Sequence, residues 1–222
     1  MIHVHYFITR KSSVSDAEFH RYWRDVHGPI VKRISQLRRY VQTHRVAYPG
    51  QQCAYDGAAE VWVDDLAALG EIQRSSAYRD GALADEPNFI DMTRTEWLTT
   101  RDHVFIAGPA PADGVKMLFL LKRQPGFTIE QGRRYWLEVH GPIVAALPGL
   151  RRYVQCHTVE EAYHYAEPRW DGVAQLWFDD VDALRAAVTS PQFTDIAYAD
   201  TAKFVNMDTI ESFVAREFPM IE

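Results

Sequence analysis

Phe19-His-Arg-Tyr-Trp-Arg-Asp-Val-His-Gly-Pro-Ile-Val31 is the stretch that decides the fold, because the chain contains it twice. The second copy is Gly132-Arg-Arg-Tyr-Trp-Leu-Glu-Val-His-Gly-Pro-Ile-Val144, which is identical at most positions. The similarity continues outward on the C-terminal side, where Leu37-Arg-Arg-Tyr-Val-Gln-Thr-His44 recurs as Leu150-Arg-Arg-Tyr-Val-Gln-Cys-His157. Self-similarity over this length indicates that two copies of one structural unit are fused in one chain.

The boundary between the copies is predicted at residues 108–114, Gly-Pro-Ala-Pro-Ala-Asp-Gly. Proline and glycine without large apolar residues are typical of a linker that crosses the surface. The expected domains are therefore a first repeat at 1–107 and a second repeat at 115–222.

Each repeat carries the pattern β-α-β-β-α-β. Capping boxes at Ser15–Glu18 and Thr128–Gln131 start a helix in each copy, and the Gly-Pro pair that follows His27 or His140 is predicted to end it. Strands of the first repeat are predicted at 3–9, 39–45, 58–63 and 95–101. The expected fold class is α+β, with two ferredoxin-like βαββαβ repeats whose antiparallel sheets pack into a pseudo-dimeric barrel.

Strand alternation separates the two faces of each sheet. In the third strand, Ala59, Val61 and Val63 are expected to pack on the helices, which leaves Glu60 and Trp62 on the other face. We expect that other face to line a partly polar cavity. The residues predicted to share it are His5, Gln42, His44, Glu60 and Trp62 in the first repeat and Gln155, His157, Gln175 and Trp177 in the second.

Composition excludes several classes of protein. The chain has 222 residues, 47% of them apolar, so it has enough apolar surface for a folded core. Its net charge of -6 argues against nucleic acid as a partner. No run is long and apolar enough for a membrane span and no leader is evident, so we expect a soluble, cytoplasmic protein without a membrane partner. Cys53 and Cys156 have no spacing typical of a metal or redox site.

The paired motif Tyr22-Trp23-x-x-x-His27-Gly28-Pro29, each copy followed by a Tyr-Val-Gln-x-His strand, resembles the EthD family of dimeric α+β barrel proteins. The resemblance covers almost the whole chain, twice. It implies that a tandem chain is a covalent version of a dimer of single-domain relatives. It also implies that His27 and His140 are the candidate catalytic groups, and that activity is directed at aromatic polyketide-like compounds.

Imidazole is suited to proton transfer near neutral pH, so His27 is a plausible catalyst on chemical grounds as well. The alternative is structural, with the ring capping the last carbonyls of the helix. The repeats differ where His5 and Glu60 of the first correspond to Leu118 and Gln175 of the second. Because a carboxylate can tune an imidazole, the first repeat is predicted to carry the chemistry, with His27 and Glu60 catalytic and His140 as the second candidate.

Together with these residues, the resemblance implies a cofactor-independent lyase or isomerase, which decarboxylates, dehydrates or cyclises a hydrophobic aromatic or polyketide-like carbonyl compound. A cofactor-free oxygenase and a non-catalytic ligand-binding barrel are the alternatives. No dinucleotide, phosphate-loop or zinc motif is present in the sequence, so no cofactor or metal is predicted, and haem stays open by analogy with barrels of the same superfamily. A homodimer of the fused chain is a further expectation, from the symmetry of most oligomers.

Overall fold

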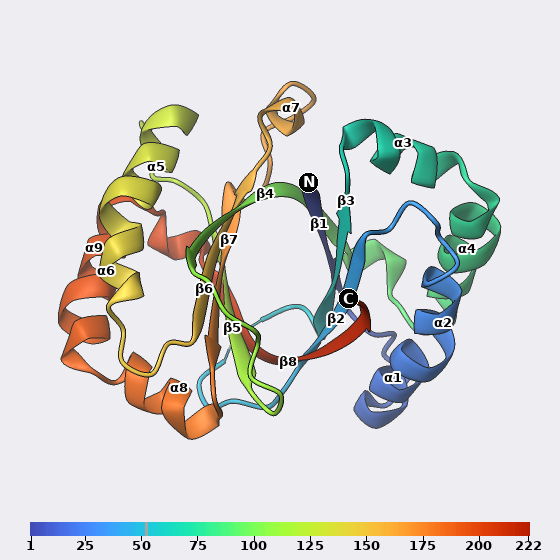
Figure 1. Cartoon of the computed structure of the whole chain (residues 1–222), viewed down its shortest axis with the longest axis horizontal. Coiled ribbons are helices and arrows are strands. Elements are labelled where there is room, and N and C mark those ends of the chain that lie inside the picture. The colour runs from blue at the N-terminus through green and yellow to red at the C-terminus, as the bar shows by residue number, and fades with distance from the viewer. Residues whose placement is uncertain (52) are drawn as a thin grey trace. The chain divides into compact units, whose positions relative to one another are not determined.

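The structure is a computed structural model that describes residues 1–51 and 53–222. The first repeat contains strands and helices in the predicted order, and its bounds lie within a few residues of the predicted ones except that the last strand is longer (Figure 1). The strands are β1 (Ile2–Ile8), β2 (Arg39–Arg45), β3 (Gly57–Val63) and β4 (Glu96–Ile106). The helices are α1 (Asp16–Tyr22), α2 (Gly28–Val31), α3 (Leu66–Arg74) and α4 (Leu83–Asp85).

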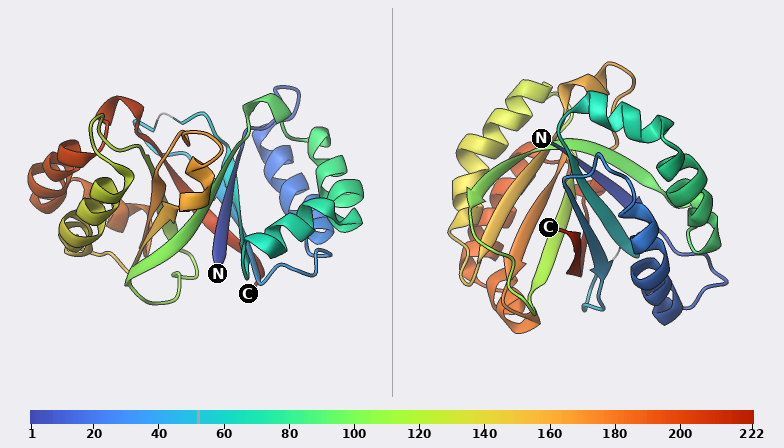
Figure 2. Two further views of the ribbon diagram at one scale, coloured as in Figure 1. Left: turned by 90° about the horizontal axis from the view of Figure 1, so that it is seen from above. Right: turned by 45° about the vertical axis from the view of Figure 1, so that its right-hand side comes forward.

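The second repeat has the same order of elements, with one additional short helix after its second strand. Its strands are β5 (Val115–Leu121), β6 (Arg152–Thr158), β7 (Gly172–Phe178) and β8 (Glu211–Ile221). Its helices are α5 (Ile129–Tyr135), α6 (Gly141–Ala145), α7 (Glu160–Tyr163), α8 (Val181–Val188) and α9 (Tyr198–Phe204). In each repeat the helices cover one face of the repeat's own strands, α1–α4 in the first repeat and α5, α6, α8 and α9 in the second (Figure 2).

Two compact units divide the chain, and they do not coincide with the repeats at their ends. One unit takes residues 1–45, 54–99 and 217–222, and the other takes 46–53 and 100–216. The long strands β4 and β8 therefore each belong partly to both units. The strand order is β4-β1-β3-β2-β8 in the first unit and β8-β5-β7-β6-β4 in the second. The α+β class with two βαββαβ repeats is confirmed, and the closed strand order is what the predicted barrel requires.

Strand register decides which side chains share a face of the first sheet. His5 lies opposite Glu60, so it shares a face with Glu60, as predicted, and His3, opposite Trp62, lies on the same face. Gln42, however, lies opposite Ala59, and Val41 lies opposite Glu60. Antiparallel partners point to the same side. The prediction that Gln42 and His44 share the face of Glu60 and Trp62 is therefore wrong, and the same error applies to Gln155 and His157.

The helix-facing side of each sheet forms an apolar core. In the first unit Tyr6, Ile8, Phe19, Trp23 and Phe89 are buried together. In the second, residues of β5, β6, β7, α8 and α9 pack around Trp136. Trp23 and Trp136 are thus core residues, in agreement with their helical spacing to the other apolar residues of the motif. Within the described part of the chain, no helix combines the length and apolar character that crossing a bilayer requires.

Candidate active site in each unit

The repeated motif forms one continuous helical segment, and a π-helical turn carries the histidine. In the first repeat α1 passes into the π turn Trp23–His27 and then into α2 without a break. The prediction that Gly28-Pro29 ends the helix is therefore wrong. Pro29 is tolerated because it occupies the first turn of α2, after the wider turn has shifted the hydrogen-bond register. His27 is not at a helix C-terminus, so no terminal dipole favours its protonated form.

Gln42 of β2 ties this helical segment to the sheet. Its Nε2 donates to the Trp23 carbonyl at 2.8 Å and to the Tyr40 hydroxyl at 2.9 Å, and its Oε1 lies 3.0 Å from Nε2 of His44. A Cβ on Gly28 would lie only 2.9 Å from the Gln42 amide nitrogen, which explains the glycine of the motif. The Tyr-Val-Gln-x-His strand thus has a structural role: its glutamine attaches the helical segment to the sheet.

The second repeat has the same attachment of helix to sheet. Gln155 donates to the Trp136 carbonyl and the Tyr153 hydroxyl, and it contacts His157. The amide atoms of both glutamines are therefore engaged by the protein. This geometry does not support the substrate-binding roles predicted for Gln42, His44, Gln155 and His157.

His27 forms a dyad with a carboxylate that the sequence analysis did not single out. Nδ1 of His27 lies 2.9 Å from Oδ2 of Asp85, at the end of α4. Oδ1 of Asp85 accepts hydrogen bonds from the Tyr22 hydroxyl at 2.7 Å and from the Asn88 amide at 2.9 Å. Burial raises the pKa of Asp85, but these hydrogen bonds outweigh it and leave the pKa below its usual value. Asp85 is therefore ionised, and it fixes the Nδ1–H tautomer of His27.

Burial is also the main influence on His27 itself. It lowers the pKa of the imidazole below 6.5, against the opposing effect of Asp85. The ring is therefore neutral at pH 7, with its proton on Nδ1. Nε2 remains as the nitrogen available to a ligand, in the form of a base.

A cavity of about 330 Å³ adjoins His27 on the helix-facing side of the first sheet. Most of its lining is apolar, from β1, β2, β3, α2 and α3. A few polar groups converge on it, which is the usual composition of a small-molecule site. They include His27, Tyr6, Tyr40, Gln73, Tyr78 and Glu86.

Glu86 gives this cavity a second group suited to proton transfer. The residue is buried, and its Oε2 accepts a hydrogen bond of 3.1 Å from the Tyr6 hydroxyl. Burial raises the pKa of Glu86 to about 7, so a substantial fraction of the carboxyl is protonated at neutral pH. The cavity thus combines a neutral imidazole base with a carboxylic acid.

The second unit repeats the dyad but not the acid. Nδ1 of His140 lies 2.9 Å from Oδ2 of Asp200, and Oδ1 of Asp200 accepts a hydrogen bond from Tyr135 at 2.8 Å. His140 lines a smaller cavity of about 230 Å³. Phe119 and Thr201 line this cavity at the positions that Tyr6 and Glu86 hold in the first repeat. Among the described residues that line it, the second cavity therefore has no counterpart of this carboxylic acid or of the phenol beside it.

Residues predicted on the other face of each sheet do not line these cavities. Glu60 accepts a hydrogen bond from Thr43 and lies near His3 and His5, so Asp85, not Glu60, is the carboxylate that holds His27. The prediction that Glu60 pairs with His27 is therefore wrong. Because side chains alternate along β3, Ala59 and Val61 point toward the His27 cavity and Glu60 points away from it. His5, Trp62, Gln175 and Trp177 share that opposite face with Glu60 or its counterpart.

Asp85, Asp200, Tyr6 and Glu86 were missed in the sequence. A signal for the aspartates does exist, because Asp85 and Phe89 recur as Asp200 and Phe204 with the same spacing that separates Trp62 from Trp177. Each phenylalanine packs beside the histidine of its repeat, with ring centroids 4.9 Å apart. Tyr6 and Glu86 have no such signal, since neither residue is repeated.

Comparisons with known proteins agree with the tandem organisation. The profile of the EthD domain matches two segments, residues 11–93 and 124–208, which together make up most of the chain. A search of curated proteins found no match.

Solved structures with the same fold align over nearly the whole chain. An anthrone oxidase-like protein aligns with a TM-score of 0.67 at 12% identity, over 100% of this chain and 93% of the other. A candidate monooxygenase from Lactobacillus acidophilus aligns with a TM-score of 0.59 at 12% identity, over 97% of this chain and 93% of the other. A haem-binding protein from Thermus thermophilus aligns with a TM-score of 0.52 at 13% identity, over 99% and 92%. At such identities the likeness concerns the fold alone.

Proposed function

Because the chain belongs to the EthD domain family, we propose that it is a cofactor-independent proton-transfer enzyme that acts on a hydrophobic, aromatic or polyketide-like carbonyl compound. The observation that carries the proposal is the first cavity, in which the Asp85-held base His27 and the carboxylic acid Glu86 line one apolar space. The reaction class is that of a lyase or isomerase: decarboxylation, dehydration or cyclisation.

His27 is the base in this proposal. Nε2 removes a proton from carbon next to the substrate carbonyl, and the charge that develops on the imidazole is stabilised by Asp85 at 2.9 Å. Desolvation in the cavity strengthens that interaction, because the effective dielectric is low where water is excluded.

Glu86 is the acid. In its protonated form it donates to the enolate oxygen, or to a hydroxyl that leaves as water, while Tyr6 keeps the carboxyl oriented through its hydrogen bond. Aromatic and aliphatic walls, among them Tyr40, Tyr78 and Trp97, suit a planar hydrophobic substrate.

Proton exchange tests the proposal without knowledge of the product. A panel of aromatic and polyketide-like ketones is incubated with the protein in D₂O, and loss of the carbon-bound proton is followed by ¹H NMR. We expect exchange that depends on His27 and is abolished in His27→Ala. His140→Ala is the matched control, because it removes the same imidazole from the cavity without the acid. No His27-dependent exchange with any compound of the panel would contradict the proposal.

Oxygenation is the second candidate, and the names of the solved neighbours favour it. The same base would form a substrate carbanion, which reduces O₂ and becomes a hydroperoxide. Cleavage of the O–O bond with loss of water would leave one oxygen atom in the product as a carbonyl. The two candidates differ under anaerobic conditions, where turnover continues for the lyase or isomerase and stops for the oxygenase. An absorbance spectrum of the purified protein tests haem in the same preparation, since bound haem has an intense Soret band.

A further inference from the structure

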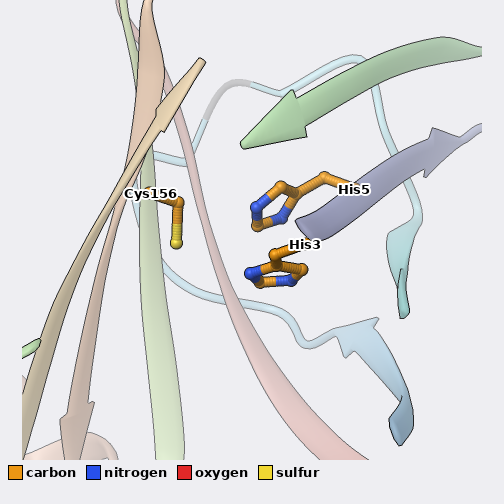
Figure 3. Close-up of side chains that lie close together, drawn as sticks. All are labelled: His3, His5 and Cys156. Carbon is orange, nitrogen blue, oxygen red and sulfur yellow. The ribbon is translucent and has the colours of Figure 1, made fainter. Parts of the chain in front are cut away.

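A second cluster of ionisable side chains is buried in the first unit, on the face of the sheet that points away from the His27 cavity. It consists of His3 and His5 on β1 and Glu60 on β3, and all three residues are fully buried. Figure 3 shows His3 and His5 side by side, with both rings on the same side of β1. The spacing of two residues along a strand produces this arrangement, because alternate side chains share a face.

The potential ligand atoms of the cluster converge on one carboxylate oxygen. Oε2 of Glu60 lies 3.3 Å from Nε2 of His3 and 3.8 Å from Nδ1 of His5. Two ligands at about 2.1 Å from a tetrahedral metal ion are ~3.4 Å apart. Both separations from Oε2 lie within a few tenths of an ångström of this value.

Neighbouring side chains hold these groups in position. Thr43 donates a hydrogen bond to Oε1 of Glu60, which leaves Oε2 toward the two imidazoles. Trp62 stacks on the ring of His3, with ring centroids 3.8 Å apart and an angle of 22° between the planes. Orientation of ligands by such outer contacts is typical of metal sites in proteins.

Charge points the same way. Burial of a carboxylate is stabilised by positive charge beside it, and Oε2 of Glu60 lies beside two imidazoles, which are also metal ligands. A divalent cation bound between the three groups would supply such charge. Two imidazoles and one carboxylate are the donor set of many Zn²⁺ and non-haem Fe²⁺ sites.

We propose that His3, His5 and Glu60 bind one divalent transition-metal ion, Zn²⁺ or Fe²⁺, at a site separate from the His27 cavity. The proposal is independent of the proposed function. The second repeat provides an internal contrast, because Lys116, Leu118 and Gln175 take the corresponding register positions and offer no such donor set. One equivalent per chain is expected, not two.

Metal binding by the untagged, full-length protein tests this inference. Apoprotein is titrated with Zn²⁺ and, without oxygen, with Fe²⁺, in competition with a chromophoric chelator, and bound metal is counted by mass spectrometry after dialysis. The variants His5→Leu and Glu60→Gln introduce the residues of the second repeat. We expect wild-type protein to bind one equivalent and both variants to bind more than ~100-fold more weakly, since loss of outer contacts alone costs about 10–100-fold.

His27→Ala is the matched control, because His27 is another buried histidine beside a carboxylate. It should retain full affinity. A Cys53→Ser/Cys156→Ser variant should also retain it, which excludes adventitious binding by the thiols of the chain, of which Cys156 is buried on β6 (Figure 3). Circular dichroism shows whether each variant is folded. X-ray absorption at the zinc edge should show imidazole and oxygen donors in the wild type.

Well under one equivalent of either metal in the wild type would overturn the inference. So would unchanged affinity in both His5→Leu and Glu60→Gln, or loss of binding in His27→Ala or in the cysteine variant. If one ligand variant does not fold, the donor atoms found by X-ray absorption in the wild type still decide the result.

Discussion

Asp85 and Glu86 are neighbours in the chain, yet their pKa values move in opposite directions. Hydrogen bonds from Tyr22, His27 and Asn88 outweigh burial at Asp85 and lower its pKa, whereas burial dominates at Glu86 and raises its pKa to about 7. Two carboxyl groups whose environments separate their pKa values take different chemical roles. Asp85 orients a base, and Glu86 is suited to act as an acid.

The pH dependence of kcat/KM should show these roles. In the proposed mechanism His27 acts when neutral, and its pKa lies below 6.5, so activity should rise with pH on the acid side at values below 6.5. The proposed acid Glu86 acts when protonated, so activity should fall as pH rises through about 7. We expect Glu86→Gln to have a lower rate and no fall of this kind on the alkaline side. An unchanged alkaline limb in Glu86→Gln would assign that limb to another group.

Stability supplies an independent measurement on the same variant. The folded-state pKa of Glu86 is raised above the ordinary value of 4.5, so its contribution to stability is present below pH 4.5 and is lost as pH rises through about 7. Between pH 5 and pH 8, Glu86→Gln should gain on the order of 2 kcal/mol relative to wild type. Urea denaturation at the two pH values measures the difference.

Asp85→Asn should remove the base without removing the imidazole. The amide of asparagine donates to Nδ1 of His27, which moves the proton of the ring to Nε2 and blocks proton abstraction. We expect a loss of about 10²–10⁴-fold in kcat/KM, with ¹⁵N NMR of the imidazole reporting the change of tautomer. Asp200→Asn is the control, and an equal loss there would place the chemistry in both units.

At the scale of elements, the helical segment α1–α2 is held to β2 through the glutamine of each repeat. The π turn and the close passage of Gln42 over Gly28 depend on each other, because the Trp23 carbonyl accepts both the Gly28 N–H and the Gln42 amide. π turns are often found at functional sites. Here the π turn includes His27, whose Nδ1 contacts Asp85.

Gly28→Ala tests this attachment of the helical segment to β2 through Gln42. The new Cβ would lie 2.9 Å from the Gln42 amide nitrogen and 2.4 Å from the end of the Met220 side chain, so the amide must move from its buried partners. We expect a loss of about 1–3 kcal/mol in the free energy of unfolding. Gly70→Ala within α3 is the control, where the nearest atom is the far end of Arg74 at 3.4 Å, and it should gain about 0.5–1 kcal/mol. Similar unfolding midpoints for the two variants would show that Gln42 does not pack against Gly28.

At the scale of the whole molecule, the two repeats have the same order of elements but different residues lining their cavities. Both units keep the histidine–aspartate dyad and a cavity, but Tyr6 and Glu86 of the first correspond to Phe119 and Thr201 of the second. Phenylalanine has no acidic proton, and the threonine hydroxyl is a far weaker acid than a carboxyl. Under the proposed function, we expect the second cavity to bind a ligand without completing the reaction.

His27→Ala should therefore lose far more activity than His140→Ala. General acid–base catalysis contributes about 10²–10⁴-fold, and we expect a loss of that order for His27→Ala and less than about 10-fold for His140→Ala. Thermal melts accompany the kinetics, because both rings are buried and contact a carboxylate. Equal losses in activity with equal losses in stability would indicate that both dyads are structural.

Sequence by itself determined the repeat, the order of strands and helices, and the family. These features are local: capping boxes, alternation and the His-Gly-Pro motif can be read within a few residues. The sequence also identified His27 and His140, which do line the two cavities. It placed the helix end at Gly28 wrongly, because a π turn changes hydrogen-bond register in a way that composition does not reveal.

Tertiary structure alone decided which carboxylate each histidine meets. Asp85 is 58 positions from His27 in the chain and comes beside it only when the last helical turns of the repeat pack against α1 and α2. Glu60 was expected there although strand alternation places it on the face of β3 that points away from the helix carrying His27. A separate error matched the faces of β2 and β3 one residue out of register, which put Gln42 and His44 on the wrong face. Burial also gives Glu86 its acidity near pH 7, and burial is a property of the packed molecule, not of the residue.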